Sequence, residues 1–249
     1  RSAEILYGKT TSDTINLLVK DLGIKFVESI WIGEQNQKYM SNLTLIHRFN
    51  RDLKVKYPEL YEIIKEHLKV LETLNVIGNI NIKNQEYSFN GESVFFSSNS
   101  YIADFLGTYT KSTINKIVNL FAVLGLIIKI PEAKIKAQLL HESKMISKRR
   151  HLGNIISYYT IPSFLNVFEE SNERAKILLA HNIKYHNINK RKIQYIFGEN
   201  FANKIYVQEI QKNKSDKVVD MIEDLERNIK DLIERQGYTT KKQVADIKI

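Results

Sequence analysis

Residues 101–129, YIADFLGTYTKSTINKIVNLFAVLGLIIK, predict two helices joined by a tight turn. Apolar residues recur at helical spacing over 101–106 and again over 114–124. The polar stretch between them begins with Gly107, as a tight turn between two helices requires. The hydroxyl of Thr110 is placed to cap the second helix.

The outward face of the second helix is polar and basic. With its apolar positions turned inward, the exposed side chains are expected to be Lys111, Ser112, Asn115, Lys116 and Asn119. None of the five is a carboxylate, and these residue types suit phosphate oxygens and base edges. The sequence therefore predicts a helix that lies against nucleic acid.

A strand is predicted to follow the second helix directly. Gly125 stands where the helix needs a left-handed residue at its end, and over residues 126–130 the apolar period shortens to that of a strand. The order helix, turn, helix, strand resembles a winged-helix DNA-binding domain. The resemblance implies binding to duplex DNA, with the second helix in the major groove and the following loop, the wing, on the backbone or minor groove.

The N-terminal segment repeats this motif. Residues 3–16 align with residues 103–115 when Tyr7 is skipped, so that a glycine, the capping threonine and a Thr-Ile-Asn triplet coincide. Internal similarity of this kind indicates a duplicated architecture.

Residues 1–50 are the predicted first winged-helix domain. Two runs rich in β-branched and aromatic residues, 24–32 and 38–46, predict a hairpin that forms its wing. Trp31 on this hairpin is expected to be a packing residue. The helix that should precede Ala3 is absent from the sequence, so we expect an N-terminally clipped domain.

Residues 57–161 are the predicted second winged-helix domain. An amphipathic helix over 58–74 opens it, and Asn90-Gly91 predicts a two-residue hairpin turn. The wing, residues 131–153, is long and basic and would lie over phosphates or reach a minor groove, and its apolar residues also indicate a short helix within it. Strands are predicted over residues 80–82, 87–89, 94–96 and 154–161.

Residues 162–214 are predicted to form a helical region. One helix is expected over 163–181 and another over 189–211, the latter broken near Gly198. The basic run at 190–192 is typical of a solvated helix face.

Residues 215–249 are predicted to form a short coiled-coil-like helix and a tail. Apolar residues at spacings of four and three over 215–236 indicate either a homodimer or packing on the protein's own body. Residues 239–247 look like the entry to a third helix-turn-helix.

The positive charge is concentrated in the middle of the chain. The net charge of the 249 residues is +9, and residues 91–161 hold nine Lys and Arg against four Asp and Glu, whereas residues 1–90 hold twelve against eleven. Such a distribution is expected of a nucleic-acid binder, although a membrane or an acidic protein would also suit it. With only 10 Gly and 3 Pro, the chain is expected to be mainly helical.

The sequence shows no constellation of catalytic residues. Glu132-Ala133-Lys134 fits the acid-x-Lys part of a nuclease site, but the upstream metal-binding aspartate of such a site is not evident. The absence of cysteine excludes disulfides and thiolate metal sites and fits a reducing cytoplasm, and no apolar run approaches the roughly 18 residues of a membrane span. We therefore predict a cytoplasmic protein that is not an enzyme and has no cofactor, no metal and no membrane partner.

The predicted fold is mainly α with small β-hairpin wings, in two winged-helix domains followed by a helical C-terminal region. The predicted DNA contacts of the second domain are Thr110, Lys111, Ser112, Asn115, Lys116, Lys144, Lys148, Arg149 and Arg150. Those of the first domain are Lys9, Thr11, Ser12, Asn16 and Lys20.

Two uses of such a DNA-binding protein stay open. One is a transcriptional regulator, and the other is a replication or partition initiator of a plasmid or other mobile element, which the Lys, Asn and Ile bias of an AT-rich source slightly favours. The alternative is a tandem winged-helix protein-protein scaffold without specific DNA recognition.

Overall fold

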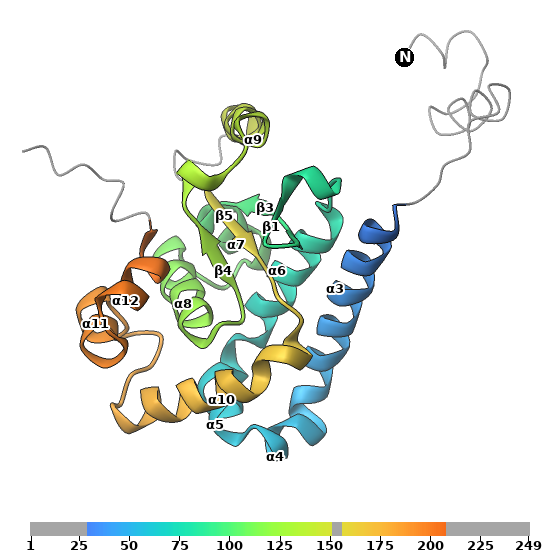
Figure 1. Cartoon of the computed structure of the whole chain (residues 1–249). Helices are drawn as coiled ribbons and strands as arrows, with labels where there is room; N and C mark the ends of the chain where they lie inside the picture. Colours follow the sequence, from blue (N-terminus) through green and yellow to red (C-terminus); the bar gives the residue numbers. More distant parts are fainter. Residues whose placement is uncertain (1–28, 151–155, 208–249) are drawn as a thin grey trace, which may run out of the picture. The chain divides into compact units, whose positions relative to one another are not determined.

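The structure is a computed structural model that describes residues 29–150 and 156–207, with the backbone alone for residues 147–150. Its internal contacts divide the chain after Asn187 into two units. The described part of the first unit holds α3 to α10 with the β-strands, and the described part of the second holds α11 and α12 (Figure 1). The described residues are mainly helical with small antiparallel sheets, as predicted.

Helix α3 (Ile30–Arg48) replaces most of the hairpin predicted over residues 24–46. That prediction is wrong for the part of the segment that the structure describes. Its aromatic and β-branched residues favour strands, but the buried positions Trp31, Gln35, Tyr39 and Asn42 recur every three or four residues, which is the period of a helix. Tertiary packing therefore overrides local strand propensity here.

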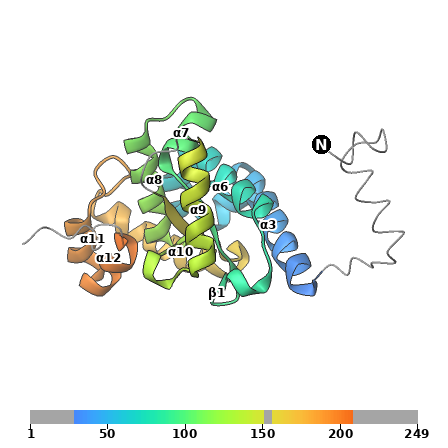
Figure 2. The same ribbon diagram turned by 90° about the horizontal axis from the view of Figure 1, so that it is seen from above.

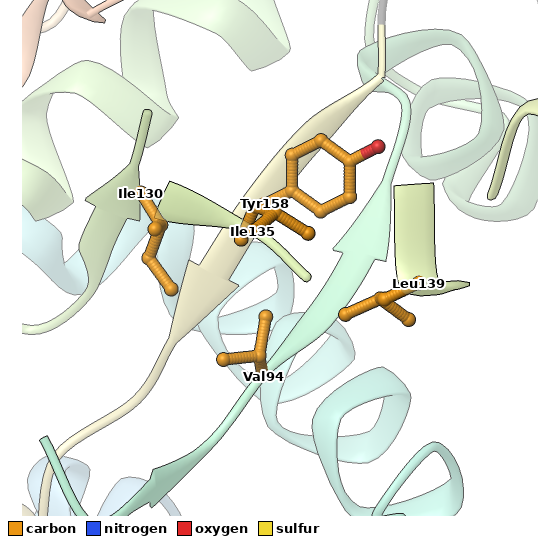
Figure 3. Packing of buried hydrophobic residues seen from close by; sticks show 5 residues of the cluster. All are labelled: Val94, Ile130, Ile135, Leu139 and Tyr158. Atoms are coloured by element: carbon orange, nitrogen blue, oxygen red, sulfur yellow. The ribbon is translucent and has the colours of Figure 1, made fainter. Parts of the chain in front are cut away.

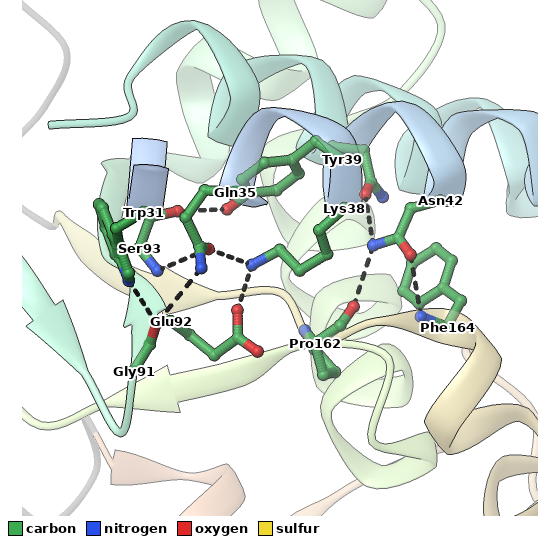
Figure 4. A network of polar contacts seen from close by, with 11 residues as sticks. Trp31, Gln35, Lys38, Tyr39, Asn42, Gly91, Glu92, Ser93, Pro162 and Phe164 are labelled. Atoms are coloured by element: carbon green, nitrogen blue, oxygen red, sulfur yellow. Dashed lines mark hydrogen bonds and ion pairs between the residues drawn. The ribbon is translucent and has the colours of Figure 1, made fainter. Parts of the chain in front are cut away.

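The buried face of α3 includes polar side chains that bond to the hairpin of β1 (Ser88–Phe89) and β2 (Glu92–Ser93). Trp31 Nε1 donates to the carbonyl of Gly91 at 3.0 Å, and Gln35 Oε1 accepts from the backbone N–H of Ser93 at 3.1 Å (Figure 4). Lys38 Nζ pairs with Glu92, and burial lowers the pKa of Lys38 although the carboxylate acts in the opposite direction. Trp31 is a packing residue, as expected, but it packs from a helix.

The segment after α3 is helical as far as residue 80 except for a bend at Tyr57. A π-helical turn (Phe49–Leu53) and α4 (Lys54–Lys56) follow α3. The helix predicted over 58–74 is present as α5 (Pro58–Ile64), a 3-10 turn (Lys65–His67) and α6 (Leu68–Ile80). The strand predicted over 80–82 is wrong, because Ile80 is the last residue of α6.

A hairpin and a three-stranded antiparallel sheet follow α6. Strands β1 (Ser88–Phe89) and β2 (Glu92–Ser93) form the hairpin, and both turn residues, Asn90 and Gly91, have positive φ, as a type I′ turn requires. The sheet consists of β3 (Phe95–Ser97), β4 (Ile128–Ile130) and β5 (Ser157–Thr160) in the order β3-β5-β4. The central strand is therefore the last one in the sequence.

Both faces of the sheet are covered. Phe95 and Tyr159 pair across β3 and β5, and the helical body covers their face. Helix α9 (Ala137–Arg150), together with a 3-10 turn (Glu132–Lys134), lies in the connection between β4 and β5 (Figure 1). Figure 2 shows α9 in the view from above. On the outer face, five buried side chains pack together: Val94, Ile130, Ile135, Leu139 and Tyr158 (Figure 3). The short helix expected within the wing is thus confirmed, and it packs on the sheet.

Helix α10 (Phe164–Ala180) is the last helix of the first unit, and its bounds are close to the predicted 163–181. It packs on α5 and on α8 (Lys111–Leu124), and its Phe168 ring makes edge contacts with Phe49 and Tyr57 at centroid distances of 5.0 and 5.5 Å. In the second unit, α11 (Lys190–Phe197) and α12 (Glu199–Ile205) are separated at Gly198, the predicted break.

Several predictions concern residues outside the described ranges. They are the first copy of the helix-turn-helix, the coiled-coil-like helix over 215–236 and the entry to a third helix-turn-helix over 239–247. Among the helices of the described residues, none has the length and apolar character needed to cross a membrane.

Candidate nucleic-acid interface

The predicted helix-turn-helix elements are present as α7 (Asn99–Leu106) and α8 (Lys111–Leu124). Gly107 ends α7 with a φ of 68°, a conformation that glycine adopts without steric cost. Thr110 caps α8, because its Oγ1 accepts a hydrogen bond from the backbone N–H of Thr113 at 3.2 Å. Gly125 ends α8 with a φ of 83°. The turn chemistry predicted for this stretch is confirmed.

The first turns of α8 present a polar surface to solvent. Thr110, Lys111, Ser112 and Asn115 are exposed. Lys116 is half-buried, and its Nζ donates to the backbone carbonyl of His186 at 3.2 Å. Four of the five predicted α8 contacts are therefore accessible. The fifth, Lys116, is hydrogen-bonded to the loop after α10.

Asn119 does not belong to this surface. It was expected to face outward, but its side chain is only 5% exposed, and its Oδ1 accepts a hydrogen bond from Lys129 Nζ on β4. The helix packs on its neighbours over its whole second half, from Ile117 to Leu124, so only its first turns are free of the body. The helical period alone cannot show where along a helix the neighbouring elements end.

Asn115 has a partner that the sequence did not indicate. Its Oδ1 accepts a hydrogen bond from Asn99 Nδ2, at the start of α7, at 3.1 Å. The Oδ1 of Asn99 is buried and has no partner among the described residues. This bond holds the Asn115 carboxamide in one orientation and leaves its NH2 group as a donor.

An aromatic cluster supports the turn between the two helices. Tyr109 donates from its hydroxyl to the carbonyl of Glu66 at 3.1 Å, and its ring lies 6.5 Å from that of His67. The His67 ring also meets the edge of Tyr185 at 4.4 Å between centroids. Burial lowers the pKa of His67 and raises the pKa of Tyr109. The turn is thus anchored to the 3-10 turn before α6 and to the loop after α10.

The basic residues predicted on the wing lie on or beside α9. Lys144 is exposed, and its Nζ forms an ion pair with Glu132 at 2.9 Å, which raises the pKa of Lys144. An exposed pair of this kind is worth about 0–1 kcal/mol, so a phosphate group can compete for the lysine. The side chains of Lys148, Arg149 and Arg150 lie outside the described residues, as do Lys9, Thr11, Ser12, Asn16 and Lys20.

Within residues 29–150 and 156–207, no group of three or more His, Cys, Asp or Glu could hold a metal ion. Glu132 of the acid-x-Lys triplet is engaged by Lys144 instead. Comparison with models of protein families, with curated proteins and with solved structures found no match to this chain.

Proposed function

We propose that this chain binds double-stranded DNA and that α8 is the recognition helix of a winged-helix domain spanning residues 57–161. The observation that carries the proposal is the exposed, carboxylate-free group Lys111, Ser112 and Asn115 on the first turns of α8. In helix-turn-helix proteins, the N-terminal residues of the second helix are the ones that contact base edges.

The order of elements supports the same proposal. A helix-turn-helix unit, α7 and α8, stands between β3 and β4. The connection between β4 and β5 corresponds to the wing, and β5 returns to the centre of the sheet. In this arrangement α7 would cross the DNA backbone while α8 enters the major groove.

The charge distribution supports contact with phosphates. Residues 91–161 carry nine Lys and Arg against four Asp and Glu. Lys111 is exposed and forms no ion pair with any described residue, so it is available to a phosphate group. Asn115 would then read an adjacent base, and adenine is the usual partner of asparagine.

The biological use of this binding is also a proposal. We propose either a cytoplasmic transcriptional regulator or a replication or partition initiator of a plasmid or other mobile element, with self-association through residues 215–236. An initiator must bind its origin and act where the duplex opens, whereas a regulator needs only the duplex.

A protein-protein scaffold is the second candidate, and three contacts favour it. Lys116 bonds to His186, Lys144 pairs with Glu132, and α9 lies packed on the sheet. Each of these contacts reduces the basic surface that a free wing and a free helix would offer to DNA.

The test is a titration of the full chain against labelled duplexes selected from a random library, at several salt concentrations. Lys111→Ala is expected to weaken binding to all sequences and to reduce the magnitude of the salt slope by about 1. Asn115→Ala is expected to reduce discrimination at one base pair by about 1–3 kcal/mol. Asn99→Ala, which leaves Asn115 in place but removes its hydrogen bond, should reduce the same discrimination more weakly.

Lys54→Ala is the matched control, because Lys54 is an exposed lysine on α4. It should leave affinity and salt slope close to those of the unaltered chain. Binding that ignores salt, or equal effects of the Lys111 and Lys54 substitutions, would reject DNA recognition by α8 and favour the scaffold.

A further inference from the structure

Helix α11 in the second unit carries a separate basic and aromatic surface. Asn189 caps the helix, since its side chain accepts a hydrogen bond from the backbone N–H of Lys192 at 3.0 Å. Ile193 faces inward and is fully buried. The opposite side presents four exposed side chains, hereafter the α11 face: Arg191, Lys192, Gln194 and Tyr195.

Tyr195 is the centre of the α11 face. It is 85% exposed, more than any other large hydrophobic side chain among the described residues. Arg191 precedes it by four residues and Lys192 by three, so both cations lie one helical turn away and flank the ring.

Within the described residues, the charges of the α11 face are uncompensated. Neither Arg191 nor Lys192 forms an ion pair with a described residue, and α11 itself contains no carboxylate. Over residues 188–207 there are four Lys and Arg and one acidic residue, Glu199. Unpaired cations that flank an exposed aromatic ring suit a partner that is anionic and offers flat apolar surfaces.

We propose that the α11 face binds single-stranded DNA, with Tyr195 stacking on a base and with Arg191 and Lys192 on the flanking phosphates. Proteins that hold single strands combine cations along the backbone with aromatic rings that stack on bases. In a duplex the base faces are covered by their neighbours, so a ring of this kind finds its partner only where the strands are separated.

The choice of DNA over RNA rests on the proposed function, in which the same chain binds duplex DNA through α8. The chemistry of the α11 face suits either nucleic acid, because stacking and phosphate contacts do not require a 2′-hydroxyl. Single-strand binding by the second unit would favour the initiator over the regulator, since an initiator acts where the duplex is opened.

The test measures the affinity of the full chain for labelled oligothymidine by fluorescence anisotropy, with oligouridine and a duplex in parallel. Tyr195→Ala is expected to weaken oligothymidine binding by about 5- to 150-fold, the range for loss of one stacked base. Tyr195→Phe should retain affinity, whereas Tyr195→Leu, which is apolar but has no aromatic face, should lose it. Arg191→Ala should weaken binding and lower its salt dependence.

Leu165→Ala is the control, because Leu165 is an apolar side chain that is 66% exposed on α10. It should leave oligothymidine affinity unchanged. Stacking by Tyr195 would be overturned if the unaltered chain and Tyr195→Ala bound oligothymidine equally well, or if Tyr195→Leu retained affinity. The choice of DNA would be overturned if the chain bound oligouridine more tightly than oligothymidine.

The failures of the two proposals are distinguishable. Tyr195→Ala should leave duplex affinity intact, whereas Lys111→Ala should reduce duplex affinity and leave oligothymidine affinity intact. If the unaltered chain binds oligothymidine through Tyr195 but binds no duplex, recognition by α8 is rejected and the α11 face stays supported.

Discussion

The buried carboxamide of Asn42 accepts a hydrogen bond from the backbone N–H of Phe164, 122 residues further along the chain, at 2.9 Å. The NH2 group of the same side chain donates to the carbonyl of Pro162 at 2.9 Å (Figure 4). It also donates to Oδ1 of Asn75 at 3.2 Å. One fully buried side chain on α3 therefore joins α6 and the start of α10.

Replacing Asn42 with leucine is expected to destabilise the first unit by about 2–5 kcal/mol. The substitution removes the partner of the buried Phe164 N–H, of the buried Asn75 Oδ1 and of the partly buried Pro162 carbonyl. A buried group left without a partner costs about 1–3 kcal/mol, reduced by local rearrangement. Chemical denaturation of the full chain measures the change. Met40→Ala on the same helix removes an exposed side chain and should change the free energy of unfolding by less than about 0.5 kcal/mol.

Two helical glycines should respond to alanine in opposite directions. A Cβ at Gly78 on α6 would lie 2.6 Å from Cε1 of Tyr39, a fully buried ring whose hydroxyl is hydrogen-bonded to Ser93. Gly78→Ala is therefore expected to cost about 1–3 kcal/mol.

Gly33 on α3 is the matched comparison, because a Cβ there would meet nothing within 4 Å. Gly33→Ala should stabilise the helix by about 0.5–1 kcal/mol through the lower backbone entropy of alanine when unfolded. Thermal melting of both variants measures the two changes in stability. A loss of stability in both would contradict the open space around Gly33.

The cap of α8 should contribute measurable stability. Thr110→Ala removes the acceptor for the N–H of Thr113 and is expected to cost about 1 kcal/mol. Thr110→Ser keeps the hydroxyl and should retain most of the stability. Hydrogen exchange of the first amides of α8 measures the effect locally, and Thr108→Ala, an exposed substitution in the same turn, should leave those amides unchanged.

Protonation of His67 should destabilise the protein below neutral pH. Burial lowers the pKa of His67 in the folded state, while the Glu66 charge acts in the opposite direction. As the pH falls through the unfolded-state pKa of about 6.5, the unfolded chain binds a proton that the folded chain does not. Stability is therefore full above this pH and declines below it, with a slope of at most about 1.4 kcal/mol per pH unit.

Denaturation curves recorded between neutral and mildly acidic pH test this contribution. His67→Phe removes the buried Nδ1, which has no partner among the described residues, and should flatten the decline. His181→Gln alters an exposed histidine and should leave the decline in place. An identical pH dependence in the His67 variant would reject the assignment.

The helix-turn-helix stretch could be predicted because its signals are local. Gly107 and Gly125 are needed where φ is positive, and Thr110 caps a helix that begins one residue later. The Asn90-Gly91 turn is local in the same sense. Such residues set the conformation and hydrogen bonds of the backbone within a few positions of themselves, so their effect can be predicted without knowledge of the fold.

Sequence reasoning was wrong where the partner is remote. The segment now seen as α3 contains aromatic and β-branched residues that favour strands, yet Gln35 and Asn42 are buried on it. Their hydrogen-bond partners, Ser93 and Phe164, lie more than 50 residues away. The segment predicted as a hairpin is therefore a helix, because contacts with residues far along the chain bury one of its faces.

The candidate nucleic-acid interface also has features set by local sequence and features set by remote contacts. The threonine cap of α8 and the common side of Lys111, Ser112 and Asn115 could be predicted, because capping and helical period depend only on neighbours along the chain. The burial of Asn119 against Lys129, the contact of Lys116 with His186 and the packing of α9 on the sheet could not be predicted in this way. Exposure depends on which other elements pack nearby, and that packing is set by contacts between residues far apart in sequence.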